Sequence, residues 1–290
     1  MTLEDESIYI LREAAAQFEN PVILYSAGKD SSVLAHLARK AFFPAPIPFP
    51  FLHIDTGMKF AEMYTFRDQF AFRYGIRMIH YREESGSSAH PDLLGTEKCC
   101  ALLKTKALLN ALKMHGFDAA IGGSRRDEEK SRAKERIFSV RNVHGYWDVR
   151  NQRPELWRLY NGYKGKEENF RVFPLSNWTE LAIWRYIQQE NISIAPLYFA
   201  KEREVVFRKG QYILYTPSLA LGPGEIPIQQ ICRFRTLGCS PCTGAILSQA
   251  DTIDKIIQEI STIRHSERTT RVIDQDRESS MERKKQEGYF

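Results

Sequence analysis

The sequence predicts an α/β protein with a doubly wound, mostly parallel, Rossmann-like sheet and an irregular, α-rich C-terminal portion. Between Leu3 and Ile121, short apolar runs alternate with segments whose apolar residues recur at helical spacing. Several of these runs stop at a turn rich in Gly, Ser or Asp, as strands do at the edge of a sheet. Repeated strand–helix units of this length need right-handed crossovers, which give a parallel sheet. Ligands of such sheets bind beyond the carboxyl ends of the strands.

The first half of the chain supplies the expected sheet. The helix after the first strand is indicated by Val33, Leu34 and Leu37, which share one face with Ala38 and Ala41. Residues 83–98 are rich in Ser, Gly and charge, and we expect a mobile loop there. The elements that we expect, in chain order, are a helix at 3–18, a strand at 21–25, a helix at 30–42, a strand at 49–54, a helix at 60–74, a strand at 76–81, a helix at 102–115 and a strand at 117–121.

The second half of the chain is less regular. After Val143 the alternation fades, and Pro, Trp and Tyr become frequent. Asn177 begins an Asn-Trp-Thr-Glu stretch that predicts a helix N-cap with a capping box, and the helix should run to Glu190. A last helix is expected at 252–263. The tail that follows, 264–290, has mixed charge, which is typical of a solvated or partner-docked arm.

Composition and charge limit the classes of function. Apolar residues make up 43% and charged residues 27% of the 290-residue chain, which excludes a disordered or collagen-like protein. No stretch approaches about 18 uninterrupted apolar residues, and the acidic start lacks the pattern of a signal peptide, so we expect a soluble, cytoplasmic protein without a membrane partner. The five cysteines are odd in number, which favours metal or redox chemistry over a disulfide framework. The net charge of +5 leans weakly toward anionic partners.

A turn that can cradle phosphate follows the first expected strand. The turn leads directly into a helix, so backbone N–H groups and the positive end of the helix converge. Gly28 permits close approach, Lys29 adds a point charge, and Asp30 can hold Mg2+ directly or through water. The turn lacks the spacer and second Gly of a Walker A loop, and a plain helix cap by Asp30 or Ser31 is the alternative. Its residues are Ser26, Ala27, Gly28, Lys29, Asp30, Ser31 and Ser32.

Charged residues follow two other expected strands. Asp55 ends the second strand and is placed for a nucleotide or a metal, although a turn-forming Asp before Thr-Gly explains it equally well. Gly123 ends the fourth strand and precedes a basic stretch, in which Arg125 and Arg126 can present paired donors to an oxyanion or a phosphate. Acids are interleaved with these bases, so a salt-bridged surface helix is the alternative. The other bases are Lys130, Arg132, Lys134 and Arg136.

Several long blocks of the chain resemble one known family. The loop is similar to the Ser-Gly-Gly-x-Asp-Ser loop of the N-type ATP pyrophosphatases, which include the phosphoadenosine phosphosulfate reductases. Within that family, the chain most resembles the small, adenylating subunit of bacterial sulfate adenylyltransferase. Ala27 stands at a loop position that varies in the family. The blocks that carry the resemblance are 25–32, 51–57, 122–137, 151–157, 172–179, 233–238 and 266–290.

The resemblance implies the fold of the adenine nucleotide alpha hydrolases and a defined reaction. ATP is cleaved between its α and β phosphates, AMP passes to an oxyanion, and pyrophosphate leaves. The implied organisation is an ATP-binding adenylating domain over 1–190 and a C-terminal portion over 191–290 with a Cys-x-x-Cys and a partner-docking tail. The implied ligands of ATP and Mg2+ are Ser26, Gly28, Lys29, Asp30, Ser31, Ser32, Asp55 and Gly123, and the implied catalytic residues are Lys29, Asp30, Arg125 and Arg126.

Four of the cysteines form two pairs. Cys99 and Cys100 are adjacent, and Cys239 and Cys242 form a Cys-x-x-Cys. The sulfate-activating subunits do not carry the cysteines at 99, 100 and 242, whereas the set of four is similar to the 4Fe–4S arrangement of adenylylsulfate reductases. The resemblance therefore implies a 4Fe–4S cluster, and structural zinc, a redox pair or unligated thiols are the alternatives. Cys232 lies outside both pairs and is expected to be a buried apolar residue.

Three functions are open at this point. The cysteines favour an iron–sulfur ATP pyrophosphatase that activates a DNA backbone phosphate for phosphorothioation, together with a cysteine desulfurase and other phosphorothioation proteins. The alternative is the small subunit of sulfate adenylyltransferase, which makes adenylylsulfate from ATP and sulfate with a GTPase subunit, and the tail at 266–290 favours it. The third hypothesis, from another class, is a non-catalytic DNA-binding or scaffold module that keeps the fold.

Overall fold

A six-stranded mixed sheet is the main sheet of the computed structural model, which describes residues 2–86, 89–217 and 219–262. The strand order is β3-β2-β1-β4-β6-β5, and neighbouring strands are parallel except for β5 and β6. This mostly parallel arrangement confirms the predicted fold class. The strands are β1 (Pro21–Leu24), β2 (Phe51–Ile54), β3 (Met78–Tyr81), β4 (Ala119–Ile121), β5 (Phe138–Arg141) and β6 (Asn169–Val172).

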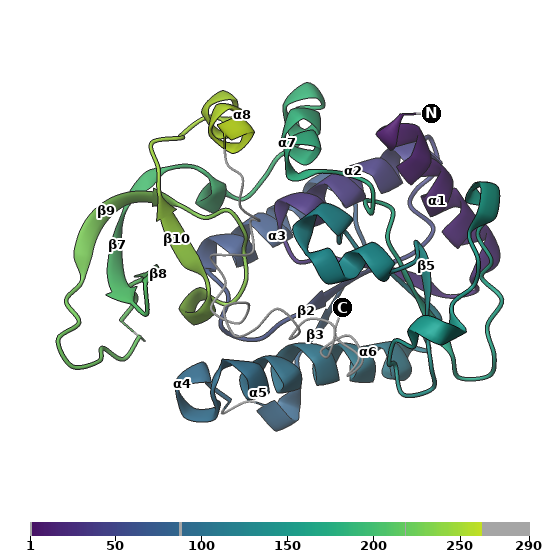
Figure 1. Cartoon of the computed structure of the whole chain (residues 1–290), viewed down its shortest axis with the longest axis horizontal. Helices are drawn as coiled ribbons and strands as arrows, with labels where there is room; N and C mark the ends of the chain where they lie inside the picture. Colours follow the sequence, from purple (N-terminus) through teal and green to yellow (C-terminus); the bar gives the residue numbers. More distant parts are fainter. Residues whose placement is uncertain (1, 87–88, 218, 263–290) are drawn as a thin grey trace.

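Helices cover both faces of the sheet (Figure 1). Adjacent strand residues point to opposite faces: Ile23 of β1 packs in the core with Leu34 of α2, whereas Val22 packs with Leu108 and Leu112 of α6. Both faces of the central strands are therefore apolar, as expected for a sheet between two helical layers. The helices are α1 (Leu3–Gln17), α2 (Lys29–Phe42), α3 (Ala61–Tyr74), α4 (Pro91–Leu94), α5 (Thr96–Cys100), α6 (Ala107–His115), α7 (Glu180–Gln189) and α8 (Ile253–Thr262).

The C-terminal portion contains a small closed β-barrel in place of the irregular, α-rich structure that we expected. The order of its strands is β10-β8-β7-β9. Lys209 and Gly210 have φ angles of 49° and 78° and form the two-residue turn between β7 and β8, for which positive φ at both positions is required. Five of the eight residues of β7 are charged, and β8 and β10 are only four residues long, so the sequence shows no clear apolar alternation there. The strands are β7 (Lys201–Arg208), β8 (Gln211–Leu214), β9 (Ile228–Arg233) and β10 (Gly244–Leu247).

The segment expected to be a loop at 83–98 contains the short helix α4 and the first three residues of α5. His90 is the N-cap of α4, where its ring nitrogen accepts a hydrogen bond from the Asp92 N–H at 3.3 Å, and Pro91 occupies the first helical position. The expected helix at 102–115 begins as a π-helical turn over Ala101–Lys106, which continues from α5 into α6. Such turns are rare and frequently occur at functional sites.

Helix α7 connects the sheet to the barrel, and helix α8 follows the last strand of the barrel. The N-cap of α7 is Thr179, whose hydroxyl accepts from the Ala182 N–H at 3.1 Å, and not Asn177 as predicted. The side-chain oxygen of Asn177 instead accepts from Arg126 at 2.7 Å. Helix α8 packs against α7 near the barrel (Figure 1). The tail at 264–290 lies outside the described residues, and within the described part of the chain no helix has the length and apolarity to cross a membrane.

Candidate functional site

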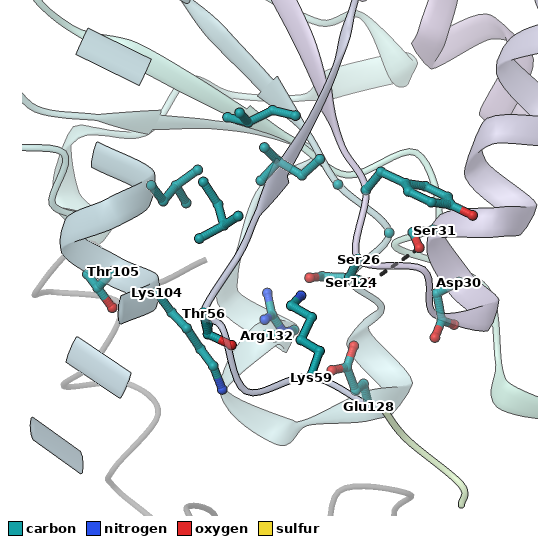
Figure 2. Close-up of a pocket in the computed structure, with 17 residues that line it drawn as sticks. Ser26, Asp30, Ser31, Thr56, Lys59, Lys104, Thr105, Ser124, Glu128 and Arg132 are labelled. Carbon is teal, nitrogen blue, oxygen red and sulfur yellow. Dashed lines mark hydrogen bonds between the residues drawn. The ribbon is translucent and has the colours of Figure 1, made fainter. Parts of the chain in front are cut away.

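A cavity of about 260 Å³ lies at the carboxyl ends of β1, β2 and β4 (Figure 2). The turns after these strands bring Ser26, Thr56 and Gly122 to its surface. Parallel strands that end at one edge of a sheet leave a crevice between the turns that follow them. The cavity therefore lies where the fold class places its ligands.

One side of the cavity is apolar. Leu24 of β1, Leu52 and Ile54 of β2 and Leu108 of α6 line it. These residues face the helical layer formed by α6, which closes the cavity from that side. An apolar surface beside polar groups suits a flat heteroaromatic ring, whose faces lose water on binding.

The turn between β1 and α2, together with the turn after β4, forms a second side of the cavity. We call it the loop wall, and it is made of Ser26, Asp30 and Ser31 from the first turn and Gly123 from the second. Ala27 has a φ of 59°, the left-handed region, and this reverses the chain direction before α2 begins. The Ser31 hydroxyl accepts from the Gly28 N–H at 3.1 Å and lies 3.3 Å from the Ser26 hydroxyl. The structure thus brings three of the predicted loop residues, Ser26, Asp30 and Ser31, to the cavity.

Lys29 is placed behind the loop wall. Its side chain is 1% exposed, its Nζ lies 3.1 Å from Asp30 Oδ2, and its backbone N–H donates to the Tyr198 hydroxyl at 2.8 Å. Ser32 is also buried, with its hydroxyl 3.4 Å from that of Tyr25. Lys29 thus contacts the Asp30 carboxylate, which in turn lines the cavity.

Arg125 and Arg126 both bind other protein groups near the cavity. Arg125 is fully buried and donates through Nε to Asp30 Oδ1 at 2.7 Å, with Asp127 at 3.4 Å. Arg126 donates to Asn177 at 2.7 Å and to the Glu135 carbonyl at 3.2 Å. The Asp30 carboxylate is consequently held between Lys29 and Arg125, one on each oxygen.

Gly123 makes the loop wall close-packed. A Cβ atom added at this position would lie 3.1 to 3.3 Å from the backbone carbonyl carbon and oxygen and the Cβ of Asp30. A side chain would have to push the turn after β4 away from the start of α2. The glycine predicted at this position is therefore required for contact between the two turns.

Asp55 lies at the end of β2 but outside the cavity lining. Its carboxylate accepts from the Tyr64 hydroxyl at 2.6 Å and from the Gly57 N–H at 2.8 Å. Burial alone would raise the pKa of Asp55, but these two hydrogen bonds outweigh it and lower the pKa. The structure thus gives Asp55 the contacts of a turn residue, and Thr56 is the residue of this turn that reaches the cavity.

Three cationic side chains that the sequence did not single out as site residues reach the cavity from different elements. We call Lys59, Lys104 and Arg132 the cation group. Lys59 follows β2, Lys104 lies on the π-helical turn, and Arg132 lies on the short 3-10 turn Lys130–Lys134. In Figure 2, Lys59 and Arg132 point into the middle of the cavity, and Lys104 lies across from Asp30 and Ser31. Their spacing in the sequence carries no motif, because only the fold brings them together.

The electrostatics of the cation group favour an anion. Burial and the nearby Lys104 lower the pKa of Lys59 to about 8, against the opposing effect of Cys239. Arg132 is 4% exposed and lies 3.2 Å from Glu135. Glu128 also lines the cavity, so the cation group has an acidic neighbour as well. A bound anion would relieve the repulsion between Lys59 and Lys104.

The two cysteine pairs meet beside the cation group. Cys99 and Cys100 end α5, Cys239 precedes the 3-10 turn Ser240–Cys242, and Cys242 ends it; all four cysteines are buried. The Cys239 sulfur lies 3.3 Å from the Thr56 hydroxyl, and residue 239 pairs with Lys59 in an isolated β-bridge. Burial raises the pKa of Cys242 to about 12, and Cys239 and Cys100 add to this effect.

The pKa of Cys239 moves in the opposite direction. Burial would raise it, but the pKa is lowered because Lys104, Thr56 and Lys59 stabilise the thiolate. In the residues that the structure describes, no group of three or more His, Cys, Asp or Glu side chains is placed to hold a metal ion. Cys232 is buried in β9 within the main apolar core, as expected for an apolar residue.

Comparison with known proteins adds a family and close relatives. Residues 20–245 match the family described as the phosphoadenosine phosphosulfate reductase domain. The chain is 58% identical to "Sulfate adenylyltransferase subunit 2" of Proteus mirabilis (strain HI4320), over 99% of this chain and 96% of that protein. It is 57% identical to the protein of the same name from Myxococcus xanthus (strain DK1622), over 99% of this chain and 95% of that protein.

Solved structures resemble the chain at much lower identity. The phosphoadenylyl-sulfate reductase of Candida auris, in a phosphate complex, is 17% identical. The match covers 66% of this chain and 82% of that protein, with a TM-score of 0.47.

Proposed function

The chain belongs to the phosphoadenosine phosphosulfate reductase domain family, and from that premise we propose that it is the adenylating subunit of a sulfate adenylyltransferase. The observation that carries the proposal is the identity of 58% over 99% of the chain to a sulfate adenylyltransferase subunit 2. The relatives support an adenylyltransferase over a non-catalytic module. They also favour sulfate as the acceptor over DNA phosphate, which the cysteines alone had favoured.

The cavity suits ATP. The apolar side can receive the adenine ring, and the loop wall can receive the phosphates at the start of α2, where the helix dipole favours negative charge. Glu128 lines the cavity and offers the carboxylate oxygens that Mg2+ prefers, so the lining fits this ion through Glu128, whereas both oxygens of Asp30 already contact cations. When bound with ATP, Mg2+ neutralises charge on the β and γ phosphates.

The reaction needs charge neutralisation more than a covalent nucleophile. A sulfate oxygen forms a bond to the α-phosphorus. The bond between that phosphorus and the oxygen that bridges the α and β phosphates breaks, and pyrophosphate leaves with the electron pair of this bond. The loop wall holds the leaving group, and Lys29 and Arg125 fix the Asp30 carboxylate that belongs to this wall. The relatives are named as subunits, and we propose a GTPase as the partner subunit.

The test of this function is acceptor dependence. We expect the purified chain with its partner subunit to release pyrophosphate from ATP only when sulfate is added, and to form adenylylsulfate in equal amount. Ser26→Ala removes a hydroxyl from the loop wall and should lower turnover about tenfold, as expected for a hydrogen bond to a charged group. Ser261→Ala, on the exposed surface of α8, is the matched control. Pyrophosphate release that is indifferent to sulfate would contradict the proposal.

A second candidate is favoured by the meeting of the four buried cysteines beside the cavity. It is an iron–sulfur enzyme that adenylates a DNA backbone phosphate for phosphorothioation, with a cysteine desulfurase as partner. Four thiolates from two segments suit a 4Fe–4S cluster, with Lys59 and Lys104 nearby to balance charge. In the described part of the chain, however, no three such side chains are placed around one metal ion.

Metal analysis separates the two candidates. Protein purified without oxygen should contain stoichiometric iron and acid-labile sulfide, and absorb visible light, if the second candidate is right. Cys242→Ser should then remove the colour, whereas Cys232→Ser, a buried cysteine outside the two pairs, should keep it. Colourless, iron-free protein that makes adenylylsulfate supports the first candidate alone.

A further inference from the structure

The cation group is assembled from three segments that are distant in the sequence. Lys59 and Arg132 point into the middle of the cavity from the turn after β2 and from a 3-10 turn (Figure 2). Lys104 reaches it from the layer on the other side of the sheet, on the π-helical turn that leads into α6. The hydroxyl groups of Thr56 and Thr105 line the same region. Ammonium, guanidinium and hydroxyl donors thus surround one space.

The loop wall and the cation group are built for different parts of a reaction. On the loop wall, the Asp30 carboxylate is already neutralised by Lys29 and Arg125, and the start of α2 supplies the site for the phosphates. Across the cavity, the ammonium groups of Lys59 and Lys104 and the guanidinium of Arg132 line one region, and besides Asp30 the acidic residue of the lining is Glu128. That second region therefore gains most from a ligand that carries negative charge.

The geometry of the transfer at the α-phosphorus places the leaving pyrophosphate and the attacking acceptor oxygen on opposite sides of the cavity. The attacking and leaving oxygens lie roughly in line on opposite sides of the phosphorus. If pyrophosphate leaves from the loop wall, the attacking oxygen must come from the far side of the α-phosphorus. In Figure 2, Lys104 lies across from Asp30 and Ser31, on the same side as Thr56 and Thr105.

We propose that Lys59, Lys104 and Arg132 form the binding subsite for the acceptor, a small tetrahedral dianion such as sulfate. The inference deepens the proposed function and rests on it. The donors orient one acceptor oxygen toward the α-phosphorus, and no proton moves, because both the acceptor and the phosphosulfate product are anions. The three cationic side chains also reduce the repulsion between the acceptor dianion and the triphosphate, which are both negatively charged.

The charges around the subsite explain its preference for a small dianion. Glu128 lines the cavity and Glu135 lies 3.2 Å from Arg132, so a larger polyanion would meet these carboxylates. A dianion placed between the lysines leaves Glu135 paired with Arg132. Arg132 is buried, so its substitution would also affect the stability of the protein. The two lysines are therefore the better positions for testing the subsite.

The experiment compares two lysine variants with a matched control, in the presence of the partner subunit. We expect Lys59→Met and Lys104→Met to raise the KM for sulfate by about tenfold or more, with less than about a threefold change in the affinity for an ATP analogue methylene-bridged between its α and β phosphates. Lys113→Met, on the exposed side of α6, should change neither quantity. An equal loss of analogue affinity would assign the lysines to the triphosphate and overturn the proposal, as would unchanged constants.

Direct binding of sulfate distinguishes a failure of the subsite from a failure of the proposed function. Sodium sulfate is titrated into the analogue-bound protein, and the lysine ammonium signals are followed by NMR. Perturbation of Lys59 and Lys104 that is lost in either variant supports the subsite, even if the wild-type chain shows no sulfate-dependent turnover and the proposed function fails. The absence of any perturbation in the wild-type chain contradicts the subsite.

Discussion

The two polar sides of the cavity differ in how their charges are arranged. On the loop wall, Asp30 accepts one cation on each carboxylate oxygen, Lys29 at 3.1 Å and Arg125 at 2.7 Å, so the charges are paired before any ligand arrives. In the cation group, Lys59 and Lys104 repel each other; burial lowers the pKa of Lys59 to about 8, an effect that Cys239 opposes and Lys104 increases. A paired network holds its shape without a ligand, whereas like charges held together are stabilised by one. The difference assigns a fixed cradle to one side and a ligand-dependent subsite to the other.

The largest expected effect comes from breaking the paired network. Asp30→Ala removes the carboxylate that contacts both Lys29 and Arg125, whose side chains are 1% and 0% exposed, while Arg125 keeps Asp127 at 3.4 Å. We expect the free energy of unfolding to fall by about 3 kcal/mol, as measured by urea denaturation. Asp251→Ala, which removes the partner of exposed Lys255, should cost less than about 1 kcal/mol. Equal effects of the two substitutions would show that the Asp30 network is not paired as described.

The next effect tests the contact between the two turns of the loop wall. Gly123→Ala places a Cβ atom 3.1 to 3.3 Å from Asp30, so the turns must separate. We expect a loss of about 1 to 2 kcal/mol of stability and a weaker affinity for the ATP analogue, measured by denaturation and calorimetry. Gly222→Ala, whose new Cβ would make ordinary contacts of 3.4 to 3.7 Å with Glu225, is the control. Unchanged analogue affinity in Gly123→Ala would separate this contact from nucleotide binding.

The pH dependence of the KM for sulfate tests the cation group, the other polar side of the cavity. Lys59 carries its charge below its pKa of about 8 and loses it as the pH rises through that value. An anion binds the charged form, so the KM for sulfate should rise above pH 8, by at most about tenfold per pH unit for one proton. The profile of Lys59→Met should be flat over pH 7 to about 9 where the wild-type profile rises. Parallel profiles in the two proteins would exclude Lys59 as the titrating group.

The smallest effect is expected at the cysteine beside the cation group. Cys239→Ser keeps a hydrogen-bonding group 3.3 Å from the Thr56 hydroxyl but removes a sulfur that interacts with Lys104. We expect a two- to threefold change, about 0.5 kcal/mol, in the KM for sulfate, and none in Cys232→Ser. A complete loss of activity, with loss of bound iron, would instead support the iron–sulfur candidate.

Local sequence carried enough information to predict the loop wall and most of the sheet. Ser26, Asp30 and Ser31 are close in the chain, and the strand-to-helix pattern around them places the turn at the edge of the sheet. Lys29 belongs to the same motif, yet as the first residue of α2 it points behind the loop toward Asp30 and Tyr198. The direction of one side chain at a helix start depends on packing, which the motif does not contain.

The cation group could not be predicted in the same way. Lys104 reaches the cavity because the helix before α6 is wound as a π-helical turn, and apolar spacing alone predicts an ordinary helix there. Lys59 is positioned by the bridge between its own turn and residue 239, a contact across 180 positions of the chain. The barrel was missed for a related reason, since charged residues such as Arg203 occupy strand positions that only the closed fold buries.

The central claim is that the triphosphate binds the loop wall and the acceptor binds the cation group. A crystal structure with the methylene-bridged ATP analogue and sulfate tests it most directly. The account predicts the β and γ phosphates beside Ser26 and Ser31, with sulfate contacted by Lys59 and Lys104 on the far side of the α-phosphorus. A triphosphate bound by Lys59 and Lys104, with the loop wall empty, would contradict it.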